Sequence, residues 1–315
     1  MHETRFIRYI AWLPALFVAA AIFYFSAQLV LELRSLLIYC GRNGDGMRYN
    51  TKRHEAEIGN TVMDYITFGE GEKTLVLIPG LSFKTVRKFA EAFSFMYRIL
   101  GKDYTVYAFD RKRQLPIGYT IKNMADDLAQ VMQKIGIEKA DVVGISQGGM
   151  IAQYLTLDHP QLVNKLVLCV TMSRLNDTAR EVISNWVRLA VNGDYAGITE
   201  DMLKIVYSDA YVEKFGKYFP LVSRFGKPKD MGQFAIKARA CLTCNCYDRL
   251  EEITCPAFVI GAGKDLVLTG EAAEEIAGKL GCECYMYEDM GHSAYEEAQD
   301  FNQRILEFLN KSSEE

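Results

Sequence analysis

The sequence predicts an α/β fold, in which a mostly parallel central sheet is covered by helices on both faces. Short apolar runs alternate with stretches of helical spacing between residues 61 and 170. The apolar runs lack polar alternation, which is typical of parallel strands that are buried on both faces. Strands that alternate with helices imply a sheet wound with right-handed crossovers.

The expected elements follow one another in regular order. Strands are expected over residues 61–68, 74–79, 104–110, 140–145, 165–170, 255–262 and 282–289. Helices are expected over residues 84–100 and 120–137, directly after residue 146, and over 294–310. In the second of these, apolar side chains recur at helical spacing at Ile121, Met124, Leu128, Val131 and Ile135.

A long insertion interrupts this alternation. About eighty residues separate the strand ending at residue 170 from the next buried strand, far more than one crossover helix requires. The excess, residues 173–246, is rich in aromatic and aliphatic side chains at helical spacing. We predict a helical cap over one end of the sheet, with the core formed by residues 56–172 and 247–315.

An uncharged apolar run over residues 9–31 predicts an N-terminal transmembrane helix. At about 1.5 Å per residue it is long enough to cross a hydrocarbon layer of about 30 Å. A cleaved signal peptide would carry a shorter apolar region and a small-residue cleavage site. We predict that residues 1–33 are a tail and a single-pass membrane anchor and that residues 34–55 are a polar stalk. The arginines on the two sides of the apolar run weakly favour a cytoplasmic catalytic domain, so the orientation in the membrane stays open.

The composition restricts the partners. A net charge of −4 and a pI near 5.7 argue against nucleic acid. The cysteines include two groups, one of Cys241, Cys244 and Cys246 and one of Cys282 and Cys284, with no histidine near either. We therefore expect no metal and interpret them as buried thiols in a reducing compartment. The oligomeric state is left open.

One serine stands between glycines at the end of an apolar strand. Gly144, Ser146 and Gly148 form a G-x-S-x-G motif between the strand 140–145 and a helix. A sharp strand-to-helix turn would expose the serine hydroxyl, and the two glycines would allow the close crossing of strand and helix. A chain of this length would contain a G-x-S-x-G motif by chance about one time in ten. The position of this motif between a strand and a helix makes it stronger evidence for a catalytic serine. Ser146 is the candidate nucleophile.

A serine hydroxyl needs a base, and the chain has four histidines. His2 precedes the apolar run, His54 lies in the predicted stalk and His159 follows the helix after the serine. His292 follows the last strand at the carboxyl edge of the sheet, where parallel sheets bind their ligands. His292 is the candidate base.

An aspartate must hold the imidazole in the correct tautomer. Asp265 follows a buried strand and lies between the serine and the histidine in chain order. Asp248 is the alternative, but it precedes its strand and would lie at the wrong edge of the sheet. Asp265 is therefore preferred.

Backbone N–H groups must stabilise the developing oxyanion. Gln147, which follows the serine directly, is one candidate donor. The second is Leu81, in the loop that follows the strand 74–79, where Gly80 lets the backbone turn freely.

Ser146, Asp265 and His292 in this chain order resemble the α/β-hydrolase fold family, particularly its single-cap branch of esterases, C–C hydrolases and peroxidase-like relatives. The resemblance covers residues 56–315, with the insertion where that family carries its lid. It implies hydrolysis through an acyl-enzyme without a cofactor. Two features depart from the family pattern: Pro79-Gly80 stands where His-Gly is common, and residues 110–116 are unusually basic. We expect this basic loop to face solvent rather than an anionic ligand.

We therefore expect a membrane-anchored serine hydrolase that cleaves a carboxylic ester of a small, lipophilic acyl substrate. Aromatic residues of the insertion could line an acyl pocket, although packing within the cap is the simpler interpretation. A proline-releasing aminopeptidase, a C–C bond hydrolase, a lactonase and an acyltransferase stay open, because they share the same three residues. A non-catalytic binding protein on this scaffold is the alternative from another class. Such proteins commonly lose one of the three residues, and here all three positions are filled.

Overall fold

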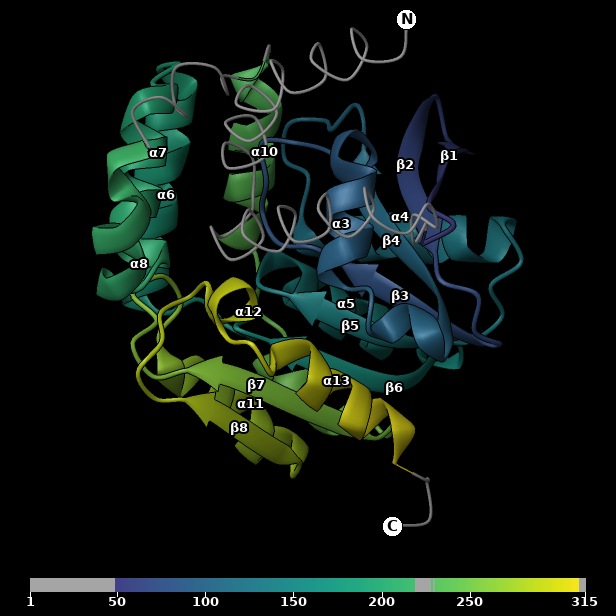
Figure 1. Cartoon of the computed structure of the whole chain (residues 1–315). Coiled ribbons are helices and arrows are strands. Elements are labelled where there is room, and N and C mark those ends of the chain that lie inside the picture. The colour runs from purple at the N-terminus through teal and green to yellow at the C-terminus, as the bar shows by residue number, and fades with distance from the viewer. Residues whose placement is uncertain (1–48, 219–227, 229, 312–315) are drawn as a thin grey trace, which may run out of the picture.

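The structure, a computed structural model, describes residues 49–218, 228 and 230–311. Its centre is an eight-stranded sheet of order β1-β2-β4-β3-β5-β6-β7-β8, parallel from β4 to β8 and antiparallel at β1 and β2 (Figure 1). The strands are β1 (Lys52–Ile58), β2 (Thr61–Phe68), β3 (Lys73–Ile78), β4 (Tyr104–Lys112), β5 (Ala140–Ile145), β6 (Val163–Cys169), β7 (Ala257–Ala262) and β8 (Glu283–Tyr287). The predicted mostly parallel α/β fold is confirmed.

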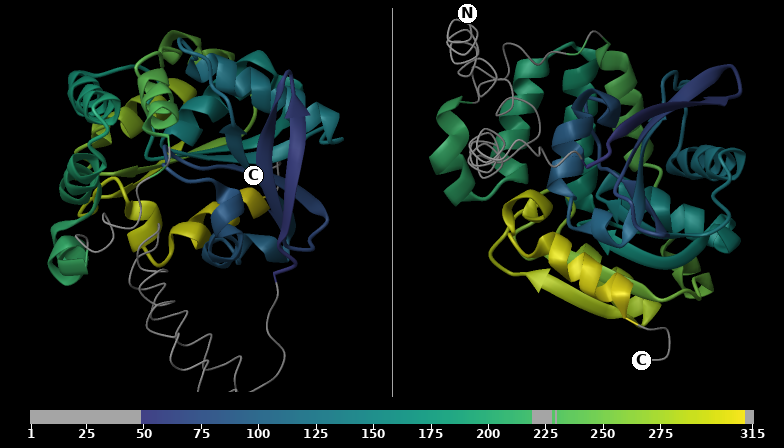
Figure 2. Two further views of the ribbon diagram at one scale, coloured as in Figure 1. Left: turned by 90° about the horizontal axis from the view of Figure 1, so that it is seen from above. Right: turned by 45° about the vertical axis from the view of Figure 1, so that its right-hand side comes forward.

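Helices cover both faces of the sheet, with a hydrophobic core beneath each layer (Figure 2). One layer contains η1 (Val86–Phe89), α3 (Ala90–Met96), η2 (Leu100–Lys102), α12 (Ala294–Glu297) and α13 (Phe301–Asn310). The other contains α4 (Ile121–Lys134), α5 (Gln147–Asp158), η3 (Pro160–Leu162), η5 (Tyr247–Glu252) and α11 (Gly270–Leu280). The expected closing helix over residues 294–310 is thus divided into α12 and α13.

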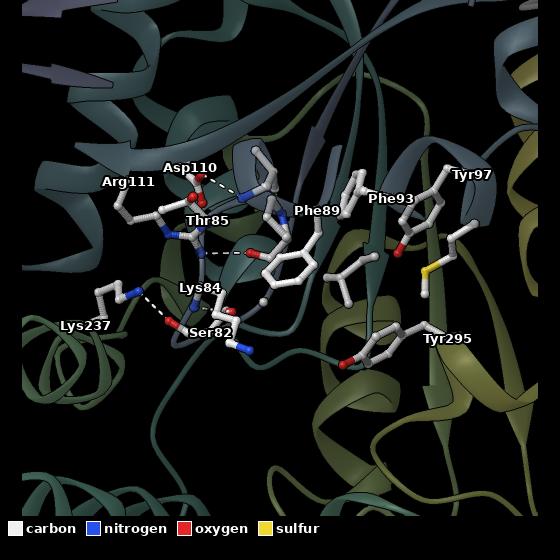
Figure 3. Close-up of a pocket in the computed structure, with 15 residues that line it drawn as sticks. Ser82, Lys84, Thr85, Phe89, Phe93, Tyr97, Asp110, Arg111, Lys237 and Tyr295 are labelled. Atoms are coloured by element: carbon white, nitrogen blue, oxygen red, sulfur yellow. Dashed lines mark hydrogen bonds between the residues drawn. The ribbon is translucent and has the colours of Figure 1, made fainter. Parts of the chain in front are cut away.

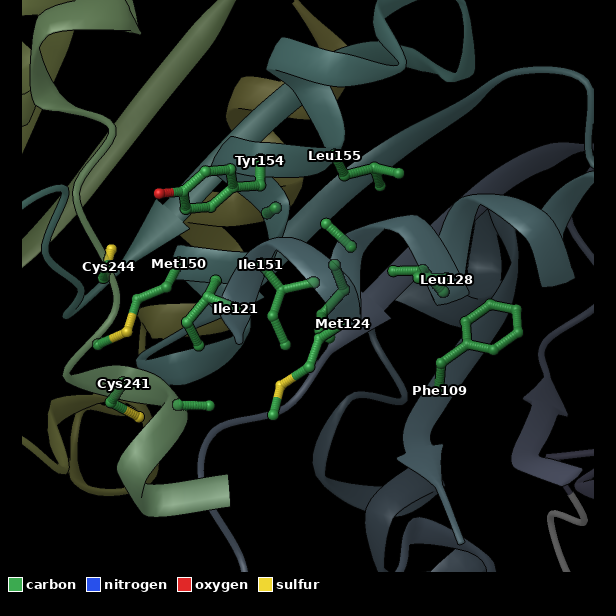
Figure 4. Close-up of a cluster of buried hydrophobic side chains, with 14 of the residues drawn as sticks. Phe109, Ile121, Met124, Leu128, Met150, Ile151, Tyr154, Leu155, Cys241 and Cys244 are labelled. Carbon is green, nitrogen blue, oxygen red and sulfur yellow. The ribbon is translucent and has the colours of Figure 1, made fainter. Parts of the chain in front are cut away.

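The larger core lies between α4, α5 and the end of α10 (Met231–Cys241). Figure 4 shows apolar side chains of α5 facing those of α4, with two cysteine thiols at their side: Met150, Ile151, Tyr154 and Leu155 against Ile121, Met124 and Leu128, beside Cys241 and Cys244. Cys241, Cys244 and Cys246 are buried free thiols, as expected, whereas Cys282 and Cys284 are half-buried. Within the part of the chain that the structure describes, no group of three His, Cys, Asp or Glu side chains could hold a metal ion.

Strand β1 was not predicted from the sequence. It pairs with β2 at the edge of the sheet and fully buries only Ala56 and Ile58. Its other residues are mostly charged, a common protection of edge strands against pairing with another chain. The prediction of a stalk over residues 34–55 is therefore wrong for residues 52–55, and its part before residue 49 lies outside the described residues.

The predicted membrane anchor, residues 1–33, also lies outside the described residues. Among the helices that the structure describes, none combines the length and the apolar character needed to cross a membrane. The anchor and its orientation stay a prediction.

Between β6 and β7 the chain forms helices at the place of the predicted cap. They are α6 (Asp177–Val191), α7 (Tyr195–Val206), α8 (Asp209–Phe215), η4 (Gly216–Tyr218) and α10. The four α-helices gather at the edge of the sheet where the parallel strands end (Figure 1). Each starts at a side chain that accepts a hydrogen bond from a backbone N–H group of its first turn: Asn176, Asp194, Ser208 and Asp230.

Candidate active site

Ser146 occupies a sharp turn between β5 and α5. Its backbone has φ 52° and ψ −120°, a region that non-glycine residues adopt only under strain. Neighbouring elements hold this conformation: the Ser146 N–H donates to the Cys169 carbonyl at 2.8 Å, and the Thr171 hydroxyl donates to the Ser146 carbonyl at 2.8 Å. The Ser146 side chain makes no capping hydrogen bond to the first turn of α5, and the turn places its hydroxyl at the edge of the sheet.

The two glycines of the motif are required by close backbone contacts. A Cβ atom at Gly144 would lie 2.5 Å from the Gly148 carbonyl oxygen. A Cβ atom at Gly148 would lie 1.9 Å from the carbonyl oxygen of Ile78, at the end of β3. Both obstacles are backbone atoms of packed elements, so neither can rotate away. The crossing of strand and helix expected from the motif is therefore present.

Gly148→Ala is expected to lower the free energy of unfolding by at least about 2–3 kcal/mol, because β3 and α5 must separate to admit the methyl group. Gly278→Ala is a matched control. It lies within α11 with no atom near the added methyl group, so it should stabilise the protein by about 0.5–1 kcal/mol. Urea unfolding measures both values. Equal midpoints for the two variants would contradict the close contact.

The three candidate residues meet above the carboxyl ends of the strands. The Nε2 atom of His292 lies 2.9 Å from Ser146 Oγ, and its Nδ1 atom lies 2.7 Å from Asp265 Oδ2. A carboxylate can only accept hydrogen bonds, so Nδ1 carries the proton. Nε2 is then the acceptor for the serine hydroxyl, which is the arrangement that a general base requires.

Asp265 is fixed and kept ionised by its surroundings. Its Oδ1 atom accepts hydrogen bonds from the backbone N–H groups of Val267 at 2.7 Å and Leu268 at 3.0 Å. Burial by itself raises the pKa of Asp265, but the adjacent His292 imidazole and these hydrogen bonds outweigh it and hold the pKa below its ordinary value. Asp265 therefore stays an acceptor for the imidazole at neutral pH.

The alternatives considered from the sequence lie elsewhere. His54 in β1 hydrogen-bonds to Thr67 in β2 at 2.9 Å, and His159 hydrogen-bonds to Asp126 at 3.0 Å. Asp248 is exposed in η5. His2 lies outside the described residues. The structure thus brings His292 to the serine and Asp265 to His292.

The loop that carries Leu81 passes beside the serine. A Cβ atom at Gly80 would lie 3.3 Å from Ser146 Cβ and 3.8 Å from Ser146 Oγ. Gln147 is the first residue of α5, where N–H groups have no partner within the helix. The residue before Leu81 and the start of α5 thus both lie next to Ser146, and the role of Leu81 and Gln147 as oxyanion donors stays a prediction.

The basic stretch after Phe109 does not form the expected solvent-facing loop. Strand β4 continues through Lys112. Arg111 Nη2 donates to the Pro79 carbonyl at 2.8 Å and to Gln147 Oε1 at 2.9 Å, and Lys112 Nζ lies 2.9 Å from an Asp127 carboxylate oxygen. The expectation is wrong for Arg111 and Lys112, because their partners come from segments far away in the sequence.

A pocket opens next to the serine, with Gly80 and Ile145 in its lining. One side is mainly apolar and is formed by η1, α3 and α12, with Phe89, Phe93, Met96, Tyr97 and Tyr295. The opposite side carries the charged groups Asp110, Arg111 and Lys237 (Figure 3). Among the described residues of the cap, Lys237 lines this pocket, whereas the aromatic residues Trp186 and Phe234 are buried. The aromatic wall from α3 was not expected from the sequence.

The cap is tied to the loop that carries His292. Glu297 Oε1 accepts hydrogen bonds from the Ser293 hydroxyl at 2.5 Å and from the Ser208 N–H at 3.1 Å. The Ser293 N–H donates to the Val206 carbonyl at 2.9 Å. The segment between α7 and α8 therefore supports the imidazole from the side of the cap.

Comparison with known proteins agrees with this arrangement. Residues 73–299 match the family model described as the alpha/beta hydrolase fold. This chain belongs to the α/β-hydrolase fold family. The predicted family is thereby confirmed, and the protein is a hydrolase of that family.

Individual relatives are distant and carry different names. The candidate carbamate hydrolase RutD of Rhizobium rhizogenes is 23% identical over 225 residues, covering 68% of this chain and 86% of that protein. The candidate non-heme bromoperoxidase BpoC of Mycobacterium tuberculosis is 28% identical over 206 residues, covering 61% of this chain and 76% of that protein. The enol-lactonase from Burkholderia xenovorans LB400 superposes with a TM-score of 0.72 at 20% identity, covering 82% of this chain and 100% of that chain. A membrane phospholipase A superposes with a TM-score of 0.65 at 19% identity, covering 98% of each chain.

Proposed function

We propose that this protein is a serine hydrolase that cleaves a carboxylic ester through an acyl-enzyme. The observation that carries the proposal is the continuous hydrogen-bond chain from Ser146 through His292 to Asp265. Ser146 Oγ attacks the ester carbonyl while His292 Nε2 takes its proton. His292 then protonates the leaving alcohol and activates the water that releases the acid. Asp265 holds the imidazole and stabilises its charged form.

The oxyanion of each tetrahedral intermediate is proposed to accept hydrogen bonds from the backbone N–H groups of Leu81 and Gln147. Leu81 follows Gly80, which lies beside the serine, and Gln147 begins α5 directly after it, so two separate segments can supply donors to one oxygen atom. Both donors are backbone groups, so the Pro79-Gly80 sequence is compatible with this role.

The acyl group is proposed to be lipophilic. The apolar side of the pocket beside the serine favours a hydrocarbon chain or ring over a polar group. Lactones and phospholipids are esters, so the names of the enol-lactonase and the phospholipase A are compatible with this chemistry. We further propose that residues 9–31 anchor the hydrolase to a membrane, where lipophilic esters accumulate.

A series of p-nitrophenyl esters from acetate to decanoate, assayed with the full-length chain in detergent micelles, tests the substrate class. Burial of each added methylene contributes about 0.8 kcal/mol, so kcat/KM should rise about fourfold per carbon until the pocket is filled. Amino-acid p-nitroanilides, including the prolyl derivative, are the comparison. Faster cleavage of the prolyl anilide than of every ester would replace the ester proposal with a peptidase.

A further inference from the structure

We infer that Arg111, assisted by Lys237 of the cap, is a positioning residue that holds the two halves of the oxyanion hole together. The inference rests on the proposed function and concerns how its oxyanion donors are fixed in space. It assigns a role to residues that do not belong to the serine–histidine–aspartate group.

A single nitrogen atom of Arg111 joins the two donor-bearing segments. Its Nη2 atom donates to the carbonyl of Pro79, two residues before Leu81, and to the side-chain oxygen of Gln147. These two acceptors belong to the loop after β3 and to the start of α5. The guanidinium therefore sets the separation between the Leu81 and Gln147 segments.

Further charged groups hold the same loop. Lys237 Nζ donates to the carbonyl of Ser82, directly after Leu81, and Asp110 Oδ2 accepts a hydrogen bond from the Val86 N–H at 2.8 Å. Figure 3 shows Asp110, Arg111 and Lys237 together on the polar side of the pocket, with Ser82 beside Lys237. The carbonyls on both sides of Leu81 are thus each held by a cation.

The cap takes part in this arrangement. Gln147 Nε2 donates to the backbone carbonyl of Lys237 at 2.7 Å. Arg111, Gln147 and α10 therefore form one network, in which the Gln147 side chain is held at its oxygen by Arg111 and at its nitrogen by α10. With its side chain fixed at both ends, the Gln147 backbone N–H has little freedom to turn away from the serine.

Such a cluster is a costly way to stabilise a fold. Burial raises the pKa of Asp110 and lowers that of Lys237, although the attraction between the two groups opposes both shifts. Removing ions from water costs several kcal/mol per ion, and an apolar cluster of similar volume often stabilises the folded protein equally or better. Donors that are already oriented lower the barrier because they need no reorganisation when the oxyanion forms. These charged side chains bond to backbone groups of the segment that carries Leu81, which favours a role in positioning over a role in stability.

The test compares Arg111→Ala with Arg113→Ala. Arg113 is the matched control, because it is also basic and near the end of β4 but lies outside the pocket lining, where it pairs with Glu55 and with the buried carboxylate of Asp64. In Arg111→Ala we expect kcat for a p-nitrophenyl ester to fall by about 30–100-fold with KM changed less than threefold, because the donors act only in the transition state. Added guanidinium should restore part of the loss. Arg113→Ala should stay within about twofold of wild type.

The rate of Ser146 labelling by a fluorophosphonate gives a second readout that does not depend on the ester chosen. Wild-type protein that is not labelled at Ser146 would refute the proposed function. Labelled wild type with an Arg111→Ala variant of equal labelling rate and kcat would refute the positioning role alone, as would a loss in Arg111→Ala that guanidinium does not restore.

Arg111→Lys covers the case in which Arg111→Ala does not fold. This variant keeps the charge but not the planar group, and its kcat should fall at least about fivefold with KM unchanged. A kcat equal to that of wild type would overturn the inference.

Discussion

Ser146→Ala is expected to abolish labelling by a fluorophosphonate probe and to lower kcat for a p-nitrophenyl ester by roughly 10⁵-fold or more. Without Oγ no acyl-enzyme can form, and His292 loses the hydroxyl that lies 2.9 Å from its Nε2 atom. The fold should persist, because alanine carries the same Cβ atom in the strained turn. Gel fluorescence after labelling and steady-state kinetics in detergent measure the two effects.

Ser173→Ala is the control for this experiment. Ser173 is a buried serine after β6, and its side chain is not part of the hydrogen-bond chain to His292. The control should be labelled like wild type. If Ser146→Ala were still labelled, another residue would be the nucleophile and the proposed mechanism would be lost.

Asp265→Asn is expected to lower kcat by about 10⁴-fold while leaving the thermal unfolding temperature nearly unchanged. The asparagine oxygen can still accept the N–H groups of Val267 and Leu268. Its NH₂ group then faces Nδ1 of His292, which must become the acceptor. The proton moves to Nε2, and the imidazole can no longer accept the hydrogen atom of the Ser146 hydroxyl.

Asp248→Asn tests which of the two aspartates considered from the sequence, Asp265 or Asp248, is the acid that orients His292. It changes an exposed side chain of η5 and should leave kcat within about twofold of wild type. Turnover is measured beside circular dichroism to show that both variants fold. A large loss in Asp248→Asn with full activity in Asp265→Asn would move the acid to η5.

The central part of the fold could be predicted because its signals are local. Strands β3, β5 and β7 are short apolar runs that end in polar or glycine-rich turns, and a parallel sheet requires such runs to be buried on both faces. Strand β1 escaped prediction because an edge strand needs little apolar surface. Only Ala56 and Ile58 of β1 are fully buried, and its charged residues are typical of a linker as well.

The positions of Ser146, Asp265 and His292 could also be predicted, since each follows a strand of one parallel sheet. Parallel strands all end at the same edge, so residues that are far apart in sequence must meet there. This reasoning needs only the order of the elements. In agreement with it, hydrogen bonds of 2.9 Å and 2.7 Å join the three side chains in the structure.

By itself, the sequence determined the parallel strands of the sheet, the cap insertion and the edge at which the candidate residues gather, because periodicity and chain order encode backbone topology. Only the tertiary structure decided that Arg111 turns inward to Pro79 and Gln147, that Lys237 reaches from the cap to Ser82, and that α3 supplies the aromatic wall of the pocket. A charged side chain has the same local pattern whether it faces water or a distant carbonyl. The partner of such a side chain depends on how segments that are distant in sequence pack together. The residues next to it in the sequence therefore do not predict that partner.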